Sequence, residues 1–124
     1  MPQTVTPYLY YDDPAAALDW LSRAFGFRET ERTTGAAGGM HAELSVGEGG
    51  RVFLGGPMPS PKSVGARTAD VYAYVDDVDA AFSRALECGA TAVEEPGDQA
   101  YGERRCGVAD PEGHYWWLAA PIAS

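Results

Sequence analysis

The sequence has few of the residues that build disulfides, metal centres and nucleic-acid interfaces. It holds two cysteines, two histidines and nine basic residues, against 18 acidic residues, for a formal net charge of −9. Cys88 and Cys106 form no CxxC pair, so we expect buried free thiols in a reducing compartment rather than a disulfide or a zinc site. The negative charge would repel phosphate backbones, which argues against nucleic-acid binding.

Long apolar runs are also lacking. No stretch approaches the roughly 20 apolar residues that a membrane helix needs, and residues 1–12 lack the charged start and apolar middle of a signal peptide. We therefore expect a cytoplasmic protein without membrane contact. The chain has 124 residues, of which 45% are hydrophobic, and this is enough for one domain with a modest core.

The chain contains an internal duplication. Moving back 64 residues from Arg105–Pro121 lands, without a gap, on His41–Pro57, and both segments read as two strands joined by a Glu-Gly corner. The same offset places Tyr72–Ala81 on Tyr8–Ala17, so each copy begins with a strand, an Asp-Asp pair and a helix. A repeat of this length is a whole supersecondary module.

Each copy is predicted to fold as β-α-β-β-β. In the first helix, Asp13 is a good N-cap and Gly26 a good terminator. Trp20 lies off the apolar stripe, so we expect it to be either a partly exposed packing contact or part of a subunit interface. In the second helix, Asp77 is the N-cap, Gly89 the terminator, and the apolar stripe runs from Val78 to Leu86. The expected strands are 5–11, 27–34, 40–46, 51–55, 70–75, 92–95, 104–109 and 114–119; the expected modules are 1–58 and 68–124, with a linker at 59–67.

Side-chain alternation assigns the faces of the strands. In Met40–Val46, the apolar residues Ala42 and Leu44 would face a helix, while His41 and Glu43 would face the other way. Pro96–Gly102 is expected to be a loop.

The order and spacing of these elements resemble those of the vicinal oxygen chelate superfamily, which includes glyoxalases, bleomycin-resistance proteins and extradiol dioxygenases. The sequence looks most like the PhnB-like branch of that superfamily. The resemblance spans nearly the whole chain, and its fold would be α+β, with two β-α-β-β-β modules whose mixed sheets curl into a cup, often completed by a homodimer. The segments that support it are VTPYLYYDDPAAALDWLSRAFGF at 5–27, MHAEL at 40–44, YVDDVDAAFSRALECGA at 74–90 and YGERRCGVADPEGHYWW at 101–117.

The resemblance also implies where a metal would bind. In the family's metal enzymes, the first and last strands of each module supply one ligand each, and those positions here correspond to Thr6, Phe53, Asp70 and Trp117. Only Asp70 has a side chain that binds metal ions well, whereas catalytic sites usually need about three such ligands. We therefore expect no metal cofactor.

A relocated metal site is the alternative. His41 and Glu43 share a face and could join Asp70 around a divalent ion. Without a metal, His41 and Glu43 would be polar groups bonded to neighbours such as Arg105.

The same alternation predicts an aromatic ligand-binding face. Such a face would suit a flat or cationic organic molecule through stacking, apolar burial and cation–π attraction. The simpler interpretation is that several of these rings fill the core. The predicted ligand-binding residues are Tyr8, Tyr10, His41, Glu43, Phe53, Asp70, Tyr72, Tyr74, Arg105, Tyr115 and Trp117.

Three classes of function stay open on the sequence alone. The first is metal-independent binding, including sequestration, of a small aromatic or cationic molecule, as the bleomycin-resistance relatives imply. The second is a lyase or dioxygenase, with a relocated metal or with metal-free acid–base chemistry by Glu43, Asp70 or His41. The third is a structural or regulatory partner protein, for which no dedicated surface feature is evident.

Overall fold

The computed structural model describes residues 5–35, 39–57 and 69–122, and it divides the chain into two compact units, Met1–Ala66 and Arg67–Ser124. The predicted linker, 59–67, lies outside the described residues. Within the described ranges, neither helix is long and apolar enough to cross a membrane.

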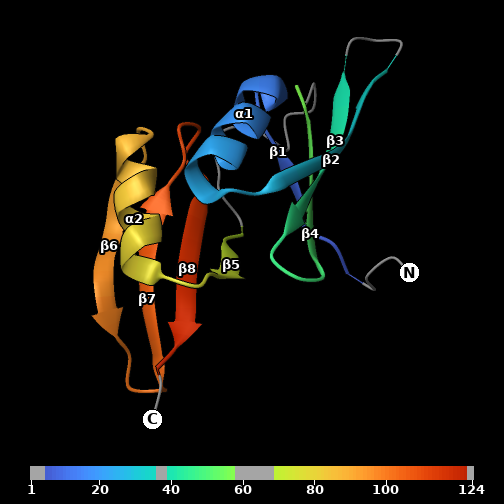
Figure 1. Cartoon of the computed structure of the whole chain (residues 1–124). Helices are drawn as coiled ribbons and strands as arrows, with labels where there is room; N and C mark the ends of the chain where they lie inside the picture. Colours follow the sequence, from blue (N-terminus) through green and yellow to red (C-terminus); the bar gives the residue numbers. More distant parts are fainter. Residues whose placement is uncertain (1–4, 36–38, 58–68, 123–124) are drawn as a thin grey trace. The chain divides into compact units, whose positions relative to one another are not determined.

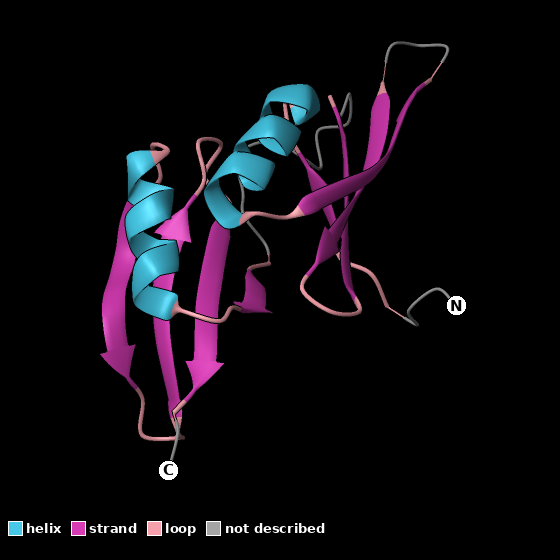
Figure 2. Cartoon of the chain, viewed as in Figure 1, coloured by secondary structure: helices cyan, strands magenta, loops and turns pink. Residues whose placement is uncertain are grey.

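Each unit has the predicted order of elements (Figures 1 and 2). The α+β class and the two β-α-β-β-β modules are therefore confirmed. Unit 1 comprises β1 (Tyr8–Tyr10), α1 (Pro14–Phe25), β2 (Arg28–Thr34), β3 (Met40–Val46) and β4 (Gly50–Gly56). Unit 2 comprises β5 (Val71–Tyr74), α2 (Val78–Glu87), β6 (Thr91–Asp98), β7 (Glu103–Ala109) and β8 (Tyr115–Pro121).

Both sheets are mixed and share one topology. The strand orders are β1-β4-β3-β2 and β5-β8-β7-β6, with the first pair parallel and the other pairs antiparallel. Tyr8 lies opposite Phe53 in unit 1, and Tyr72 lies opposite Trp117 in unit 2. The duplication seen in the sequence is thus also a duplication of strand register.

The two helices begin in the same way. Oδ1 of Asp13 accepts a hydrogen bond from the backbone N–H of Ala16 at 3.0 Å, and Oδ1 of Asp77 accepts one from Ala80 at 3.0 Å. These N-caps satisfy backbone donors that have no partner inside the helix. Gly26 ends α1 with φ of 73°, a conformation that disfavours residues with a Cβ.

Each sheet buries the face that its own helix covers. Ala42, Leu44 and Leu54 in unit 1 are fully buried, as are Trp116 and Leu118 in unit 2. Helix α1 packs on β2, β3 and β4, and α2 packs on β6, β7 and β8 (Figure 2). The opposite face of each sheet is not covered by the helix of its own unit, and we call it the uncovered face.

Three local expectations are corrected. Trp20 is only 5% exposed, and its ring meets Phe25 edge-on at 5.3 Å between centroids, so it belongs to the core. Leu86 is 38% exposed, although it was placed on the buried stripe of α2. Strand β6 runs on to Asp98 through Pro96, where a loop was predicted. Its two register shifts against β7 explain how an edge strand accepts proline.

Cysteine chemistry follows the prediction in part. Both cysteines are free thiols; Cys106 is buried, and Cys88 is partly exposed. Burial raises the pKa of the Cys106 thiol to about 11, which keeps it protonated and unreactive at neutral pH.

A buried carboxylate fixes the turn between β7 and β8. Asp110 is 4% exposed, and its Oδ2 accepts a hydrogen bond from the indole Nε1–H of Trp116 at 3.1 Å. Its Oδ1 accepts backbone N–H groups of Glu112 at 3.1 Å and His114 at 3.0 Å. Asp110 therefore holds both the turn and Trp116, the largest buried side chain of unit 2.

We expect Asp110→Asn to destabilise the fold by about 1–3 kcal/mol, because an amide that serves the two backbone donors turns its own N–H₂ toward the Trp116 indole donor. Urea unfolding measures this loss. Glu112→Gln, on the exposed side of the same turn, should change stability by less than about 0.5 kcal/mol. Equal stability of the two variants would contradict this role.

Candidate functional site

The uncovered faces of both sheets display aromatic and charged side chains. Tyr8 and Tyr10 are 40% and 41% exposed, and Tyr72 and Tyr74 are 42% and 58% exposed. The interpretation that these four rings fill the core is therefore wrong. Phe53, Trp117 and Tyr115 are half-buried on β4 and β8.

In unit 1, three of the predicted residues form a hydrogen-bonded chain. The phenol oxygen of Tyr8 lies 2.8 Å from Nδ1 of His41, and Nε2 of His41 lies 3.0 Å from Oε2 of Glu43. The other carboxylate oxygen of Glu43, Oε1, accepts a hydrogen bond from Arg51 at 3.4 Å. The chain joins the edge strand β1 to the central strands of the sheet.

Ring contacts surround that chain. Tyr8 stacks on Tyr10, with centroids 4.9 Å apart and planes 27° apart, and it meets Phe53 edge-on at 5.9 Å. His41 also meets Phe53 edge-on, at 5.1 Å. A Cβ at Gly55 would lie 2.7 Å from the Tyr8 ring, so this glycine provides the space in which the ring sits.

The protonation of this face follows from its contacts. The pKa of the Glu43 carboxyl is lowered, chiefly by its hydrogen bond with His41, so Glu43 is an anion at neutral pH. The pKa of the Tyr8 phenol is raised, first by burial and then by Tyr10 and Glu43, so Tyr8 keeps its proton.

Glu31 is a residue of this face that sequence reasoning missed. It lies on β2 directly opposite Glu43, and one ligand atom each from Glu31, His41 and Glu43 lie within 4.8 Å of one another. Alternation along β2 was weak, and a register shift between Glu29 and Glu31 hides the pattern further.

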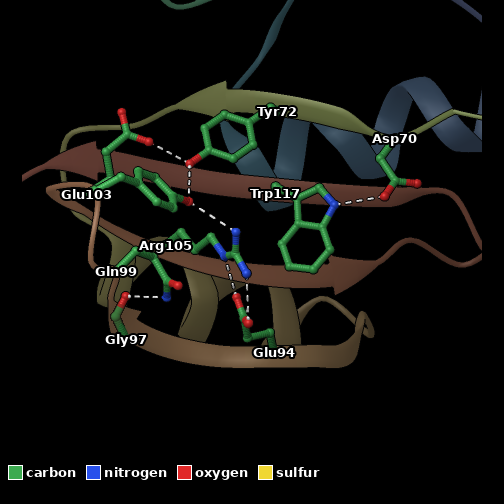
Figure 3. Close-up of polar contacts among 9 residues, drawn as sticks. Asp70, Tyr72, Glu94, Gly97, Gln99, Glu103, Arg105 and Trp117 are labelled. Atoms are coloured by element: carbon green, nitrogen blue, oxygen red, sulfur yellow. Dashed lines mark hydrogen bonds and ion pairs between the residues drawn. The ribbon is translucent and has the colours of Figure 1, made fainter.

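In unit 2, Glu103 connects two of the predicted tyrosines. Figure 3 shows its hydrogen bond with Tyr72. The phenols of Tyr72 and Tyr74 donate to its two carboxylate oxygens, each at 2.6 Å. The oxygens of Tyr72 and Tyr101 are 3.3 Å apart. Glu103 and Tyr101 were not predicted, although Glu103 shares a face with Arg105 by simple alternation.

Arg105 has three hydrogen-bond contacts within its own unit. It pairs with both oxygens of Glu94, at 2.7 and 3.1 Å, and donates to the Tyr101 phenol at 3.0 Å. Its guanidinium carbon lies 5.1 Å from the Trp117 ring centroid, within cation–π range.

Asp70 accepts the indole N–H of Trp117 at 2.9 Å, so the two positions that would supply metal ligands in unit 2 bind each other (Figure 3). The matching positions of unit 1, Thr6 and Phe53, offer a hydroxyl and a phenyl ring. This set of donors does not fit the metal that the resemblance implies.

A glycine sets the position of Trp117. A Cβ at Gly107, the residue opposite Trp117 on β7, would lie 2.6 Å from the indole Cζ3 atom. The ring therefore lies flat across the neighbouring strand, and any larger residue at this position would displace it.

A profile of the Glyoxalase/Bleomycin resistance protein/Dioxygenase superfamily matches residues 3–118. The chain belongs to this superfamily. An uncharacterised protein of Mycobacterium bovis is 39% identical over 127 residues, which cover 95% of this chain and 83% of the relative.

Solved structures agree with this assignment to the superfamily. TioX from Micromonospora sp. ML1 is 35% identical, with a TM-score of 0.74 and coverage of 98% of this chain and 99% of that chain. A superfamily member from Sphaerobacter thermophilus is 20% identical, with a TM-score of 0.70, and the match covers 96% of this chain and 98% of that chain. At this identity the match supports the fold alone.

The Glu103 contacts raise the phenol pKa values. For Tyr74 the hydrogen bond to Glu103 is the largest cause, and for Tyr72 it follows burial. We expect Glu103→Gln to lower both pKa values toward the ordinary value of about 10, because a neutral amide no longer disfavours a nearby phenolate. Ultraviolet titration of tyrosinate measures the change. Glu95→Gln, an exposed change on β6, is the control, and an unaltered Glu103→Gln curve would contradict the network.

Proposed function

We propose that the protein binds a flat, cationic organic molecule on the uncovered face of unit 2, without a metal. The observation that supports this most directly is a set of exposed rings fixed by charged side chains. Tyr72, Tyr74 and Tyr101 are each more than two-fifths exposed, and their hydroxyl groups bond to Glu103, to Arg105 or to one another. Rings that are exposed yet fixed offer contact area at a small cost in side-chain entropy.

The charges of this face favour a cation. Among the described residues of this network, Asp70, Glu94 and Glu103 bring three carboxylates and Arg105 brings one guanidinium. Arg105 neutralises Glu94 through a two-point pair, whereas Glu103 receives its hydrogen bonds from two neutral phenols. Those hydrogen bonds lower the pKa of the Glu103 carboxyl, so it is an anion at neutral pH.

Stacking would supply the remaining affinity. The Arg105 guanidinium lies over the Trp117 ring, and the exposed rings of Tyr72 and Tyr74 lie on the neighbouring strand β5. A planar cation can stack on these rings while its charge approaches a carboxylate. Burial of apolar area and charge attraction then act on the same ligand.

A second function is acid–base catalysis on unit 1. The Tyr8–His41–Glu43 chain favours it, because a histidine held between a phenol and a carboxylate has a fixed orientation and two groups with which it can exchange a proton. Turnover of a bound compound that is lost in His41→Asn would identify this function.

We also propose that the protein forms a homodimer, lies in the cytoplasm and belongs to the PhnB-like branch of the superfamily. None of them is needed for the binding proposal.

A dye titration tests the binding proposal. Proflavine, a planar aromatic cation, should bind, and acridone, a neutral molecule with the same three-ring outline, should bind more weakly. Tyr72→Ala and Trp117→Ala should each weaken proflavine binding by about tenfold or more, since loss of about 1.4 kcal/mol corresponds to a factor of ten. Glu103→Gln should weaken proflavine more than acridone.

Leu86→Ala is the matched control for this experiment, because Leu86 is exposed on the helix of the same unit. Thermal unfolding of every variant separates lost binding from lost folding. Large losses of stability in Tyr72→Ala and Trp117→Ala, with unchanged dye affinity in the folded fraction, would return both rings to a structural role.

A further inference from the structure

We propose that Glu31, His41 and Glu43 form a binding site for a divalent transition-metal ion on the uncovered face of unit 1. The site uses none of the four positions that the family resemblance assigns to metal ligands. It also does not rest on ligand binding by unit 2. The sequence suggested a metal site made of His41, Glu43 and Asp70. In unit 1 the third group beside His41 and Glu43 is Glu31, so the proposed site contains Glu31 in place of Asp70.

The strands place the three donors together. Glu31 and Glu43 are directly opposed on the antiparallel strands β2 and β3, and His41 lies two residues from Glu43 on the same face. Their ligand atoms lie within 4.8 Å of one another. Metal–ligand distances of about 2.0–2.2 Å need donor pairs about 3–4 Å apart, so a small rotation of the exposed Glu31 side chain would complete the set.

The imidazole is already oriented for this task. The Tyr8 phenol oxygen lies 2.8 Å from Nδ1 of His41, which leaves Nε2 directed at Glu43. When a metal takes Nε2, the single proton of neutral His41 is carried on Nδ1 and is donated to the Tyr8 oxygen. Histidines that bind metals commonly donate their other N–H to such a partner, which fixes the ring.

Arg51 restricts the geometry without blocking it. Its guanidinium contacts Oε1 of Glu43, and Oε2 is the oxygen that lies beside His41. A metal would therefore use Oε2. Two carboxyl groups, those of Glu31 and Glu43, can supply negative charge to a metal ion, whereas Arg51 contacts only one of them.

The donor types select the class of metal. One imidazole nitrogen with two carboxylate oxygens suits Zn²⁺, Co²⁺ or Ni²⁺, whereas Mg²⁺ prefers oxygen ligands and retains its water. Three protein ligands would leave coordination positions for water or for another molecule.

Calorimetric titration of metal-stripped protein with ZnCl₂, and separately with MgCl₂, tests the site. We expect one Zn²⁺ per chain and no Mg²⁺ binding at the same concentrations. His41→Asn and Glu31→Gln should each weaken Zn²⁺ binding by about tenfold or more. Two matched controls should bind like the wild type: Glu29→Gln, on the same strand but bonded to Arg32, and His114→Asn, the other histidine.

A second measurement uses the unmodified protein. Because the chain has two histidines, addition of Co²⁺ should broaden the ring NMR signals of His41 and leave those of His114 sharp. Absence of Zn²⁺ binding, wild-type affinity in His41→Asn and Glu31→Gln, or broadening at His114 alone would each overturn the proposal. These outcomes leave the dye titration of unit 2 unaffected, so the two proposals fail separately.

Discussion

The two-residue alternation of the β-strands is the constraint on which the rest of the structure depends. Each sheet buries one face beneath its helix, and every second residue must therefore face away from that core. On β3 this separates Ala42 and Leu44, which are fully buried, from His41 and Glu43, which are not. On the uncovered face of unit 2, Glu103 fixes the exposed rings of Tyr72 and Tyr74 by accepting hydrogen bonds from their hydroxyl groups.

The duplication shows how one framework yields two different faces. Glu43 lies opposite Phe53 in unit 1, and the equivalent pair in unit 2 is Gly107 opposite Trp117. Where unit 1 has the Glu43 side chain, unit 2 has Gly107, which has no side chain, and the Trp117 indole lies over this glycine. His41 likewise corresponds to Arg105. Unit 1 therefore carries an imidazole and a carboxylate on this face, whereas unit 2 carries an indole with a guanidinium over its ring.

The order of the strands, the helix N-caps and the two faces of β3 could be predicted from the sequence because each depends on local chemistry. Asp13 and Asp77 cap the helices as expected, since an N-cap acts within one turn. Contacts between strands were harder to predict. Register shifts on the edge strands brought Glu31 to Glu43 and Glu94 to Arg105, and a bulge cannot be read from alternation. Trp20 was misplaced because a large ring reaches the core from the margin of a helical stripe.

The most direct test of the central claim is NMR mapping of proflavine on the isotope-labelled chain. The account predicts that the indole N–H signal of Trp117, which is hydrogen-bonded to Asp70, shifts on binding together with the backbone amides of β5 and β8. Signals of α2 should move little, because that helix covers the opposite face of the sheet. Shifts concentrated on α2, or saturable binding that leaves the Trp117 indole signal unmoved, would contradict the assignment of the uncovered face as the binding site.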